Sequence, residues 1–233
     1  MPNVEVCLSP ELIHLFDLKG KIVVVTDILR ATSCMTTGIA SGVAHIKPVA
    51  TLQECEALKQ EGYFTAAERN GAKVNGFDIG NSPFSYMEDR FKGKKIATTT
   101  TNGTVAITKS TEADEVVIGA FLNLSTIANY LIEEGKDAII HCAGWKGNYS
   151  LEDTLFAGAL IEKIQLRFEL GDDASASALT NYQAVKNNLL GTILSSSHAK
   201  RLEKYIRKDI ELCATLDKYD VIPILKEGIL VKK

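Results

Sequence analysis

The chain has 233 residues, of which 26 are Lys or Arg and 29 are Asp or Glu, so its formal net charge is −3 at pH 7. With 45% hydrophobic and 24% charged residues, it has the composition of a globular protein long enough to bury a full core. Because no block of like charge occurs, the sequence disfavours nucleic acids and anionic membranes as partners.

The amino-terminal segment and the cysteines bear on the cellular compartment. The N-terminus has no basic region ahead of an apolar stretch, and no run approaches the roughly 18 apolar residues of a membrane span. The cysteines are scattered without a Cys-x-x-Cys pair, which fits neither a zinc site nor a disulfide framework. They are Cys7, Cys34, Cys55, Cys142 and Cys213. We therefore expect a cytoplasmic protein whose cysteines are reduced and buried.

Short β-branched runs alternate with amphipathic stretches along the first two-thirds of the chain. Strands are predicted at 21–26, 44–49, 95–100, 115–119 and 137–142. Helices are predicted between them at 31–41, 52–61, 104–110, 125–134 and 151–168. Strands that are apolar nearly throughout belong to sheets covered on both faces. The pattern therefore predicts an α/β fold, a three-layer α/β/α sandwich with a mixed, largely parallel central sheet.

The last third of the chain changes character. Residues 172–194 and 197–216 have helical periodicity, and the only strand candidates are 221–225 and 229–231. These late strands lead us to expect that the sheet is mixed at one edge. Because no internal repeat, low-complexity tract or linker interrupts the sequence, a single domain covering 1–233 is predicted.

Asp27 and Arg30 directly follow the predicted strand at 21–26. Ligands of open α/β sheets bind beyond the carboxyl ends of the strands, so residues in this position are candidates for chemistry. Asp27 can hold a metal or act as a base or nucleophile, and Arg30 can clamp an oxyanion with two hydrogen bonds. The alternative is that Asp27 only caps the following helix.

A run of hydroxyl side chains, Thr98 to Thr101, ends the strand at 95–100, and the Asn102–Gly103 turn opens the next helix. Backbone N–H groups at a helix N-terminus, together with nearby threonine hydroxyls, form an oxyanion site. A solvated strand end followed by a capped helix is the alternative interpretation.

Two further segments carry weaker signals. Glu68 and Arg69 are an adjacent acid and base, and residues 76–83, which include Asn81 and Ser82, form a turn rich in residues that tolerate unusual backbone angles. Considered separately, the first segment is explained by a surface ion pair and the second by a tight turn.

Acidic residues and a histidine occur near the N-termini of the helices predicted at 151–168 and 197–216. Ser150 and Asp153 fit a capping box, although Glu152 or Asp153 could instead be a metal ligand or a base. His198 lies at a predicted helix start. His45 and His141 lie in predicted strands, where packed core histidines are expected.

Several familiar chemistries are excluded by missing motifs. The chain has neither a G-x-G-x-x-G dinucleotide fingerprint nor a G-x-x-x-x-G-K-[ST] phosphate loop, and no G-x-S-x-G elbow. Position 148 is Asn, so Cys142 lacks the Arg of a cysteine-phosphatase loop. Position 29 is Leu, so Asp27 lacks the second acid of an Asp-x-Asp pair.

Taken together and in order, seven stretches make the chain resemble the 2-phosphosulfolactate phosphatase family of the coenzyme M pathway. They are DILRATS (27–33), ERNG (68–71), GFDIGNSP (76–83), TTTNGT (99–104), CAG (142–144), SLED (150–153) and SSH (196–198). The resemblance runs from about residue 22 to 223, and the combination of GFDIGNSP with TTTNGT is specific. One departure is Ala67, where the family pattern leads us to expect Gly.

The resemblance implies a magnesium-dependent phosphatase that hydrolyses 2-phospho-3-sulfolactate, or a similar small anionic phosphorylated acid, to sulfolactate and inorganic phosphate. It also implies a three-layer α/β/α fold. The alternatives are a non-catalytic binding module for a phosphorylated or sulfonated metabolite, and an isomerase or lyase acting on a phosphorylated acid. A homodimer is expected only because that assembly is common.

On this basis we assign expected roles to the candidate residues. Asp27, with Glu68 or Asp153, is expected to hold Mg²⁺ through one or two carboxylates plus waters. Asp27 is also a possible nucleophile, and Glu152 and His198 are equal candidates for the general acid. The expected substrate-binding residues are Arg30, Arg69, Asn81, Ser82, Thr99, Thr100, Thr101, Asn102 and Gly103.

Overall fold

The computed structural model describes residues 1–69 and 71–233, except for the side chains of 202–205. Asn70 of the ERNG stretch therefore lies outside the described residues. The described strands are β1 (Asn3–Cys7), β2 (Ile22–Thr26), β3 (His45–Pro48), β4 (Phe64–Arg69), β5 (Ala72–Lys73), β6 (Lys95–Thr99), β7 (Glu115–Gly119), β8 (Ala138–Cys142), β9 (Glu169–Leu170), β10 (Pro223–Lys226) and β11 (Ile229–Lys232). The described helices are α1 (Ala31–Ala40), α2 (Leu52–Ala57), α3 (Pro83–Tyr86), α4 (Gly103–Lys109), α5 (Leu124–Glu134), α6 (Leu151–Ile164), α7 (Asp173–Val185), α8 (Leu189–Ser195) and α9 (Ser197–Cys213).

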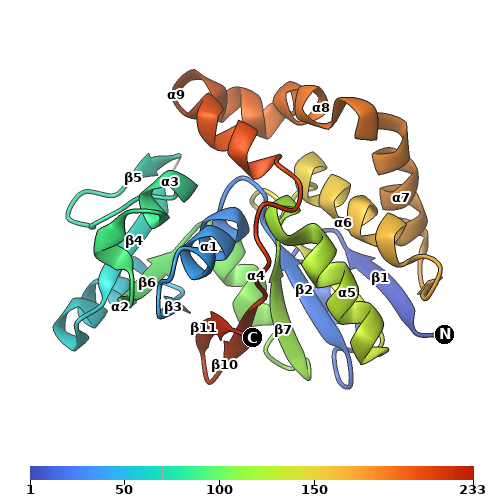
Figure 1. The fold of residues 1–233 in the computed structure, drawn as a ribbon, viewed down its shortest axis with the longest axis horizontal. Helices are drawn as coiled ribbons and strands as arrows, with labels where there is room; N and C mark the ends of the chain where they lie inside the picture. Colours follow the sequence, from blue (N-terminus) through green and yellow to red (C-terminus); the bar gives the residue numbers. More distant parts are fainter. Residues whose placement is uncertain (70) are drawn as a thin grey trace.

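Among the described residues, eleven strands form one sheet in the order β5-β4-β6-β3-β11-β10-β7-β2-β8-β1-β9 (Figure 1). One parallel group contains β2 between β7 and β8, with Thr26 opposite both Gly119 and Cys142. A second parallel group contains β3, β6 and β4. This register brings the carboxyl ends of β2, β7 and β8 to one level, where the loops that follow them meet.

The carboxyl-terminal hairpin of β10 and β11 joins the two parallel groups. β10 pairs antiparallel with β7 through Ile224 and Val117, and β11 pairs antiparallel with β3 through Leu230 and Ile46. The predicted mixed, largely parallel sheet is confirmed. The expectation that β10 and β11 lie at one edge of the sheet is wrong. They lie inside the sheet because the chain returns across it after α9, and no local pattern encodes that return.

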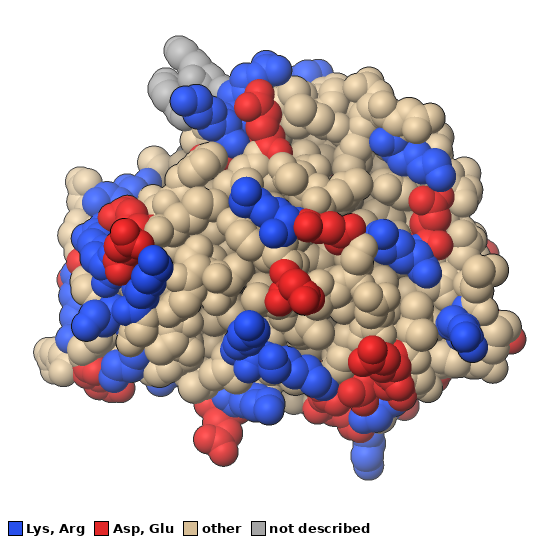
Figure 2. All heavy atoms as spheres, viewed as in Figure 1, with Lys and Arg blue, Asp and Glu red and all other residues tan. Residues whose placement is uncertain are grey.

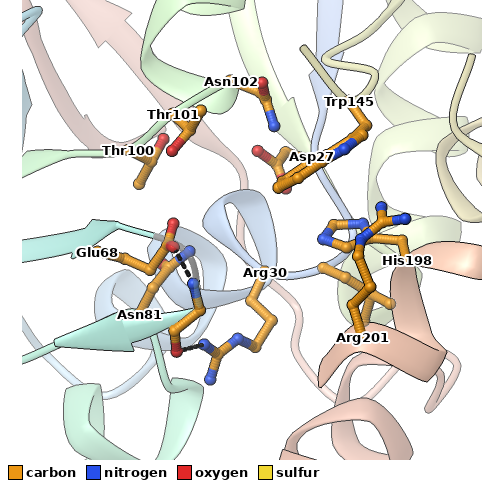
Figure 3. A pocket seen from close by; sticks show the side chains of 12 residues that line it. Asp27, Arg30, Glu68, Asn81, Thr100, Thr101, Asn102, Trp145, His198 and Arg201 are labelled. Carbon is orange, nitrogen blue, oxygen red and sulfur yellow. Dashed lines mark hydrogen bonds between the residues drawn. The ribbon is translucent and has the colours of Figure 1, made fainter. Parts of the chain in front are cut away.

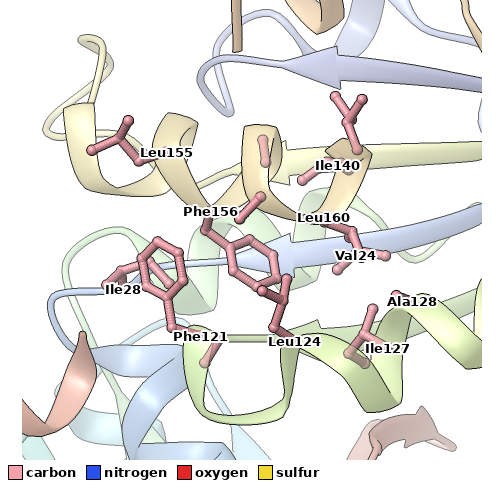
Figure 4. Close-up of a cluster of buried hydrophobic side chains, with 14 of the residues drawn as sticks. Val24, Ile28, Phe121, Leu124, Ile127, Ala128, Ile140, Leu155, Phe156 and Leu160 are labelled. Atoms are coloured by element: carbon pink, nitrogen blue, oxygen red, sulfur yellow. The ribbon is translucent and has the colours of Figure 1, made fainter. Parts of the chain in front are cut away.

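Both faces of the β2 region are covered, which explains why its strands are apolar throughout. Val24 belongs to a buried cluster with Phe121 and Phe156, whose rings meet edge to face at 5.6 Å (Figure 4). The alternate residues Val23 and Val25 belong to a second cluster, which includes residues of α1 and α4. Helices on both sides of the sheet therefore give the expected three layers.

The helices differ from the predicted ones mainly in the last third. The stretch predicted as one helix at 172–194 is divided into α7, a 3₁₀ turn (Lys186–Asn188) and α8, because Asn188 has non-helical angles, φ −138° and ψ 43°. Helix α9 also contains a kink at Ile206, with φ −137° and ψ 25°. Strands β1 and β4 were not predicted, since neither has a continuous β-branched run. Glu5 interrupts β1, and β4 contains two alanines and ends on Glu68 and Arg69.

The surface and the cysteines agree with the composition. Figure 2 shows Lys and Arg interspersed with Asp and Glu, without a large region of one sign on the face drawn. All five cysteines are free and buried, as predicted. In the described part of the chain, no helix is both long and apolar enough to cross a membrane.

The hairpin should contribute strongly to stability because Leu230 is fully buried between the two parallel groups. We expect Leu230→Ala to lower the free energy of unfolding by about 2–5 kcal/mol in urea denaturation. Leu166→Ala is the matched control, since Leu166 is 87% exposed, and it should change the free energy by less than about 0.5 kcal/mol. Equal effects of the two substitutions would contradict the structural role given to the hairpin.

Candidate active site

A cavity of about 140 Å³ lies where the loops after β2, β4, β6 and β8 meet the first turns of α9 (Figure 3). It thus spans both parallel groups of the sheet, at the carboxyl ends of the strands, as the sequence predicts. Its lining residues are Asp27, Leu29, Arg30, Glu68, Gly71, Asn81, Thr100, Thr101, Asn102, Trp145, His198 and Arg201.

Asp27 is held between the end of β2 and the start of α1. Its backbone N–H donates to the Thr32 hydroxyl at 2.9 Å, and its Oδ1 accepts from the backbone N–H of Ala31 at 3.3 Å. Asp27 is only 7% exposed. Burial, with smaller contributions from the negative charges of Glu152 and Glu68, raises its pKa to about 6, against the opposing charge of His198. The site therefore contains a carboxylate whose charge a bound cation would stabilise.

The turn after β6 approaches Asp27 more closely than a side chain would allow. A Cβ atom on Gly103 would lie 2.8 Å from Oδ2 of Asp27 and 2.6 Å from the Cβ of Ala31. The turn is fastened at Thr100, whose hydroxyl accepts from the backbone N–H of Thr104 at 3.2 Å. Gly103 is thus required for the close approach of α4 to Asp27.

Asn102 connects this turn to the loop after β8. Its Oδ1 accepts a hydrogen bond of 3.1 Å from the backbone N–H of Lys146. Because the two loops belong to different parallel groups of the sheet, this contact fixes the cavity walls relative to each other.

Only some of the predicted substrate-binding residues line the cavity. Arg30, Asn81, Thr100, Thr101 and Asn102 do so, whereas Arg69, Ser82, Thr99 and Gly103 do not.

The side chains outside the cavity have other partners. The Arg69 guanidinium donates to the Glu68 carbonyl at 2.7 Å, and the Thr99 hydroxyl donates to the Ala50 carbonyl at 3.3 Å. The Ser82 hydroxyl donates to Oδ1 of Asp209 at 3.1 Å. These three side chains are therefore engaged by other protein groups.

Asp153, a predicted metal ligand, is tied to the backbone. Its Oδ1 accepts from the N–H of Ile28 at 2.9 Å and its Oδ2 from the N–H of Gly144 at 3.1 Å. It does not line the cavity, whereas Asp27 and Glu68 do. Two of the three predicted metal ligands therefore line the cavity, and among the described residues no group of three or more His, Cys, Asp or Glu is arranged to hold a metal ion.

Glu152 and His198 form a buried acid–imidazole pair. Oε1 of Glu152 lies 2.6 Å from Nδ1 of His198, and Glu152 is 1% exposed. Burial alone would raise the pKa of Glu152, but its hydrogen bond to His198 and the charge of the imidazole outweigh burial and lower it. His198 lines the cavity and Glu152 does not. The imidazole is thus oriented through Nδ1, which leaves Nε2 for another partner.

Three residues of this region were not predicted. The Arg30 guanidinium pairs with the Asp209 carboxylate, which is 6% exposed, and donates to the Gly71 carbonyl at 3.3 Å. The guanidinium carbon of Arg201 lies 4.7 Å from the centre of the Trp145 ring. Trp145 could have been found, since it follows a strand and is the only Trp in the chain. Arg201 and Asp209 could not, because a long amphipathic helix does not mark which charged residues face a site.

Comparison with known proteins shows which family this chain is similar to. The family model for 2-phosphosulpholactate phosphatase matches residues 7–228. A protein of Caldanaerobacter subterraneus subsp. tengcongensis, described as a probable 2-phosphosulfolactate phosphatase, is 41% identical over 220 residues, covering 92% of this chain and 91% of that protein. Proteins with the same description from Thermotoga maritima, 41% identical over 90% of this chain and 91% of the relative, and from Microcystis aeruginosa, 37% identical over 96% and 97%, are also similar.

The raised pKa of Asp27 predicts that ionising this carboxylate destabilises the folded protein. Since its pKa is about 6 in the folded protein and 3.8 ordinarily, the folded state binds more protons between these values, so stability falls as pH rises through this window and stays lower above it. Asp27→Asn should therefore raise the free energy of unfolding at pH 8 by on the order of 1–3 kcal/mol in EDTA, and by only roughly 0.5 kcal/mol at pH 4, where the unfolded carboxyl is partly ionised.

Urea denaturation at the two pH values measures this effect. Asp89→Asn serves as the control because the Asp89 side chain is 88% exposed, and it should show no such gain at pH 8. An Asp27→Asn protein less stable than wild type at pH 8 would refute the linkage.

Proposed function

The chain belongs to the 2-phosphosulfolactate phosphatase family, and we propose that it hydrolyses 2-phospho-3-sulfolactate to sulfolactate and inorganic phosphate. The observation that carries the proposal is one cavity in which a buried carboxylate, Asp27, is combined with two guanidinium groups, from Arg30 and Arg201, and with an oriented imidazole. A module that only binds anions gains nothing from burying a carboxylate beside its ligand.

Hydrolysis of a phosphate monoester is very slow without a catalyst, so the site must stabilise the transition state by upwards of ~20 kcal/mol. Most of this comes from placing positive charge and hydrogen-bond donors around the transferring group. We assign that role to the Arg30 guanidinium, the Thr101 hydroxyl and the Asn102 amide, all of which line the cavity.

The residues present suit a magnesium ion. Mg²⁺ prefers oxygen ligands and is commonly bound through one or two carboxylates plus waters, and Asp27 and Glu68 supply two carboxylates to the cavity. Burial raises the pKa of Asp27, so a cation would offset an existing cost of ionising it. When bound, Mg²⁺ would supply Lewis-acid stabilisation of phosphoryl charge.

We propose Asp27 as the principal magnesium ligand and Glu68 as the second. Asp153 acts as a positioning residue, because its bonds to Ile28 and Gly144 join the backbone next to Asp27 to the loop after β8. Each carboxylate oxygen of Asp153 accepts one hydrogen bond and retains a second lone pair, which a metal ion could use. Direct binding of Mg²⁺ by Asp153 therefore stays a prediction.

The leaving alkoxide of the substrate needs a proton. Of the two candidates, His198 lines the cavity, while Glu152 lies behind it and holds Nδ1 of the ring. We propose that His198 is the general acid and donates from Nε2, and that Glu152 is a positioning residue that keeps the imidazole oriented.

The sequence also bears on the domain organisation, the compartment and the assembly of the enzyme. We propose that residues 1–233 act as one domain, supported by the single sheet among the described residues. We propose a cytoplasmic, homodimeric phosphatase that serves coenzyme M biosynthesis without a nucleic-acid or membrane partner. The five free thiols support a reducing compartment.

Release of inorganic phosphate from 2-phospho-3-sulfolactate tests the activity directly. We expect Mg²⁺-dependent release that EDTA abolishes, and Asp27→Asn should lower kcat at least about 100-fold even with saturating Mg²⁺, because it removes the principal ligand. Near-normal activity of Asp27→Asn would contradict the role of Asp27. Consumption of substrate without phosphate release would instead identify an isomerase or lyase.

The proton-donor assignment is tested by two substitutions and a chemical rescue. His198→Ala should lower kcat by about 10²–10⁴-fold, whereas Glu152→Gln should cost less because the imidazole remains. Added imidazole should restore part of the activity of His198→Ala but none of that lost in Glu152→Gln. If Glu152→Gln proves the more damaging change and imidazole rescues neither variant, the roles are reversed.

A further inference from the structure

Trp145, His198 and Arg201 form a cluster on one wall of the cavity, and the mechanism above assigns no step to Arg201 (Figure 3). The His198 ring lies 5.0 Å from the Trp145 ring, and the Arg201 guanidinium carbon lies 4.7 Å from it. His198 and Arg201 are three residues apart on α9, so they project from the same helix face. The proposed proton donor and Arg201 are therefore neighbours.

The two arginines of the cavity differ in how their charge is compensated. Arg30 is 4% exposed and forms an ion pair with Asp209. Arg201 is exposed, and its guanidinium lies over the Trp145 ring. Among the described residues, no carboxylate lies at ion-pair distance from it. The guanidinium of Arg201 is thus the one whose full charge is available to an anion entering the cavity.

The proposed substrate carries three anionic groups at different distances from the reacting phosphorus. The carboxylate is attached to the same carbon as the phosphoryl oxygen, whereas the sulfonate lies one carbon farther away. If His198 protonates that oxygen, the leaving group extends on the side of His198, where Arg201 is next on the helix. The sulfonate, which is then the group farthest from Asp27, would reach the exposed guanidinium of Arg201 rather than the buried guanidinium of Arg30.

We propose that Arg201, whose guanidinium lies over Trp145, binds the sulfonate and selects sulfonated substrates over unsulfonated ones. This inference rests on the proposed function. A guanidinium suits the role because it is planar, weakly hydrated and able to give two hydrogen bonds to one oxyanion while lying on an aromatic ring.

Binding of the product tests the proposal without turnover. Trp145 is the only Trp of the chain, so its fluorescence reports directly on the cluster. In wild type, we expect a saturable change with 3-sulfolactate at much lower concentration than with lactate. Arg201→Met should weaken 3-sulfolactate binding by about 10- to 100-fold, and Arg201→Lys should restore part of the loss.

Lys146 provides the matched control. Its ammonium also lies over Trp145, at 5.2 Å, but it is not among the residues lining the cavity. Lys146→Met therefore removes a cation from the same ring and should leave 3-sulfolactate affinity within about 3-fold of wild type. Calorimetric titration of the same variants gives the dissociation constants independently of fluorescence.

Turnover adds a second readout. Arg201→Met should lower kcat/KM for 2-phospho-3-sulfolactate about 10-fold or more beyond its effect on 2-phospholactate, which lacks the sulfonate. The inference is overturned if Arg201→Met binds 3-sulfolactate like wild type, or weakens 3-sulfolactate and lactate equally. If Arg201-dependent sulfonate binding is found but phosphate is never released, the inference stands and the proposed function falls.

Discussion

The carboxylate of Asp153 accepts two backbone hydrogen bonds, one from Ile28 after β2 and one from Gly144 after β8. These bonds fasten together the loops that carry Asp27 and Trp145, so the rest of the cavity depends on them. Each of its oxygens accepts one backbone hydrogen bond, although burial and the nearby charges of Glu152 and Asp27 still hold the pKa of Asp153 well above its usual range. Among the described residues, the Asp27 carboxylate accepts one backbone hydrogen bond, from Ala31, so it keeps lone pairs for a ligand.

The arrangement of the sheet determines which residues can meet. β10 and β11 hold the two parallel groups together inside the sheet, and the cavity lies between the loops of both groups. The contact of Asn102 with the backbone of Lys146 closes this junction from one side, and the pair of Arg30 with Asp209 closes it from α9. The active site is thus a property of the assembled sheet rather than of one loop.

Much of the site could be predicted because its residues follow strands whose apolar runs are unmistakable. Asp27 follows β2, and Thr100 to Asn102 follow β6, at the edge where ligands bind in this class of fold. Other features depend on tertiary structure alone. The position of β10 and β11, the pairing of Asp209 with Arg30 and the absence of Arg69 from the cavity lining follow from how distant segments pack. A local pattern carries no information about them.

We propose Asp27 as a buried carboxylate held ready for a cation. The most direct measurement is its pKa, determined by NMR of the side-chain carboxyl carbon in the presence and absence of Mg²⁺. We expect a pKa of about 6 without the metal, and a shift to below the ordinary value of 3.8 with saturating Mg²⁺. A pKa near 3.8 that does not respond to Mg²⁺ would contradict the claim.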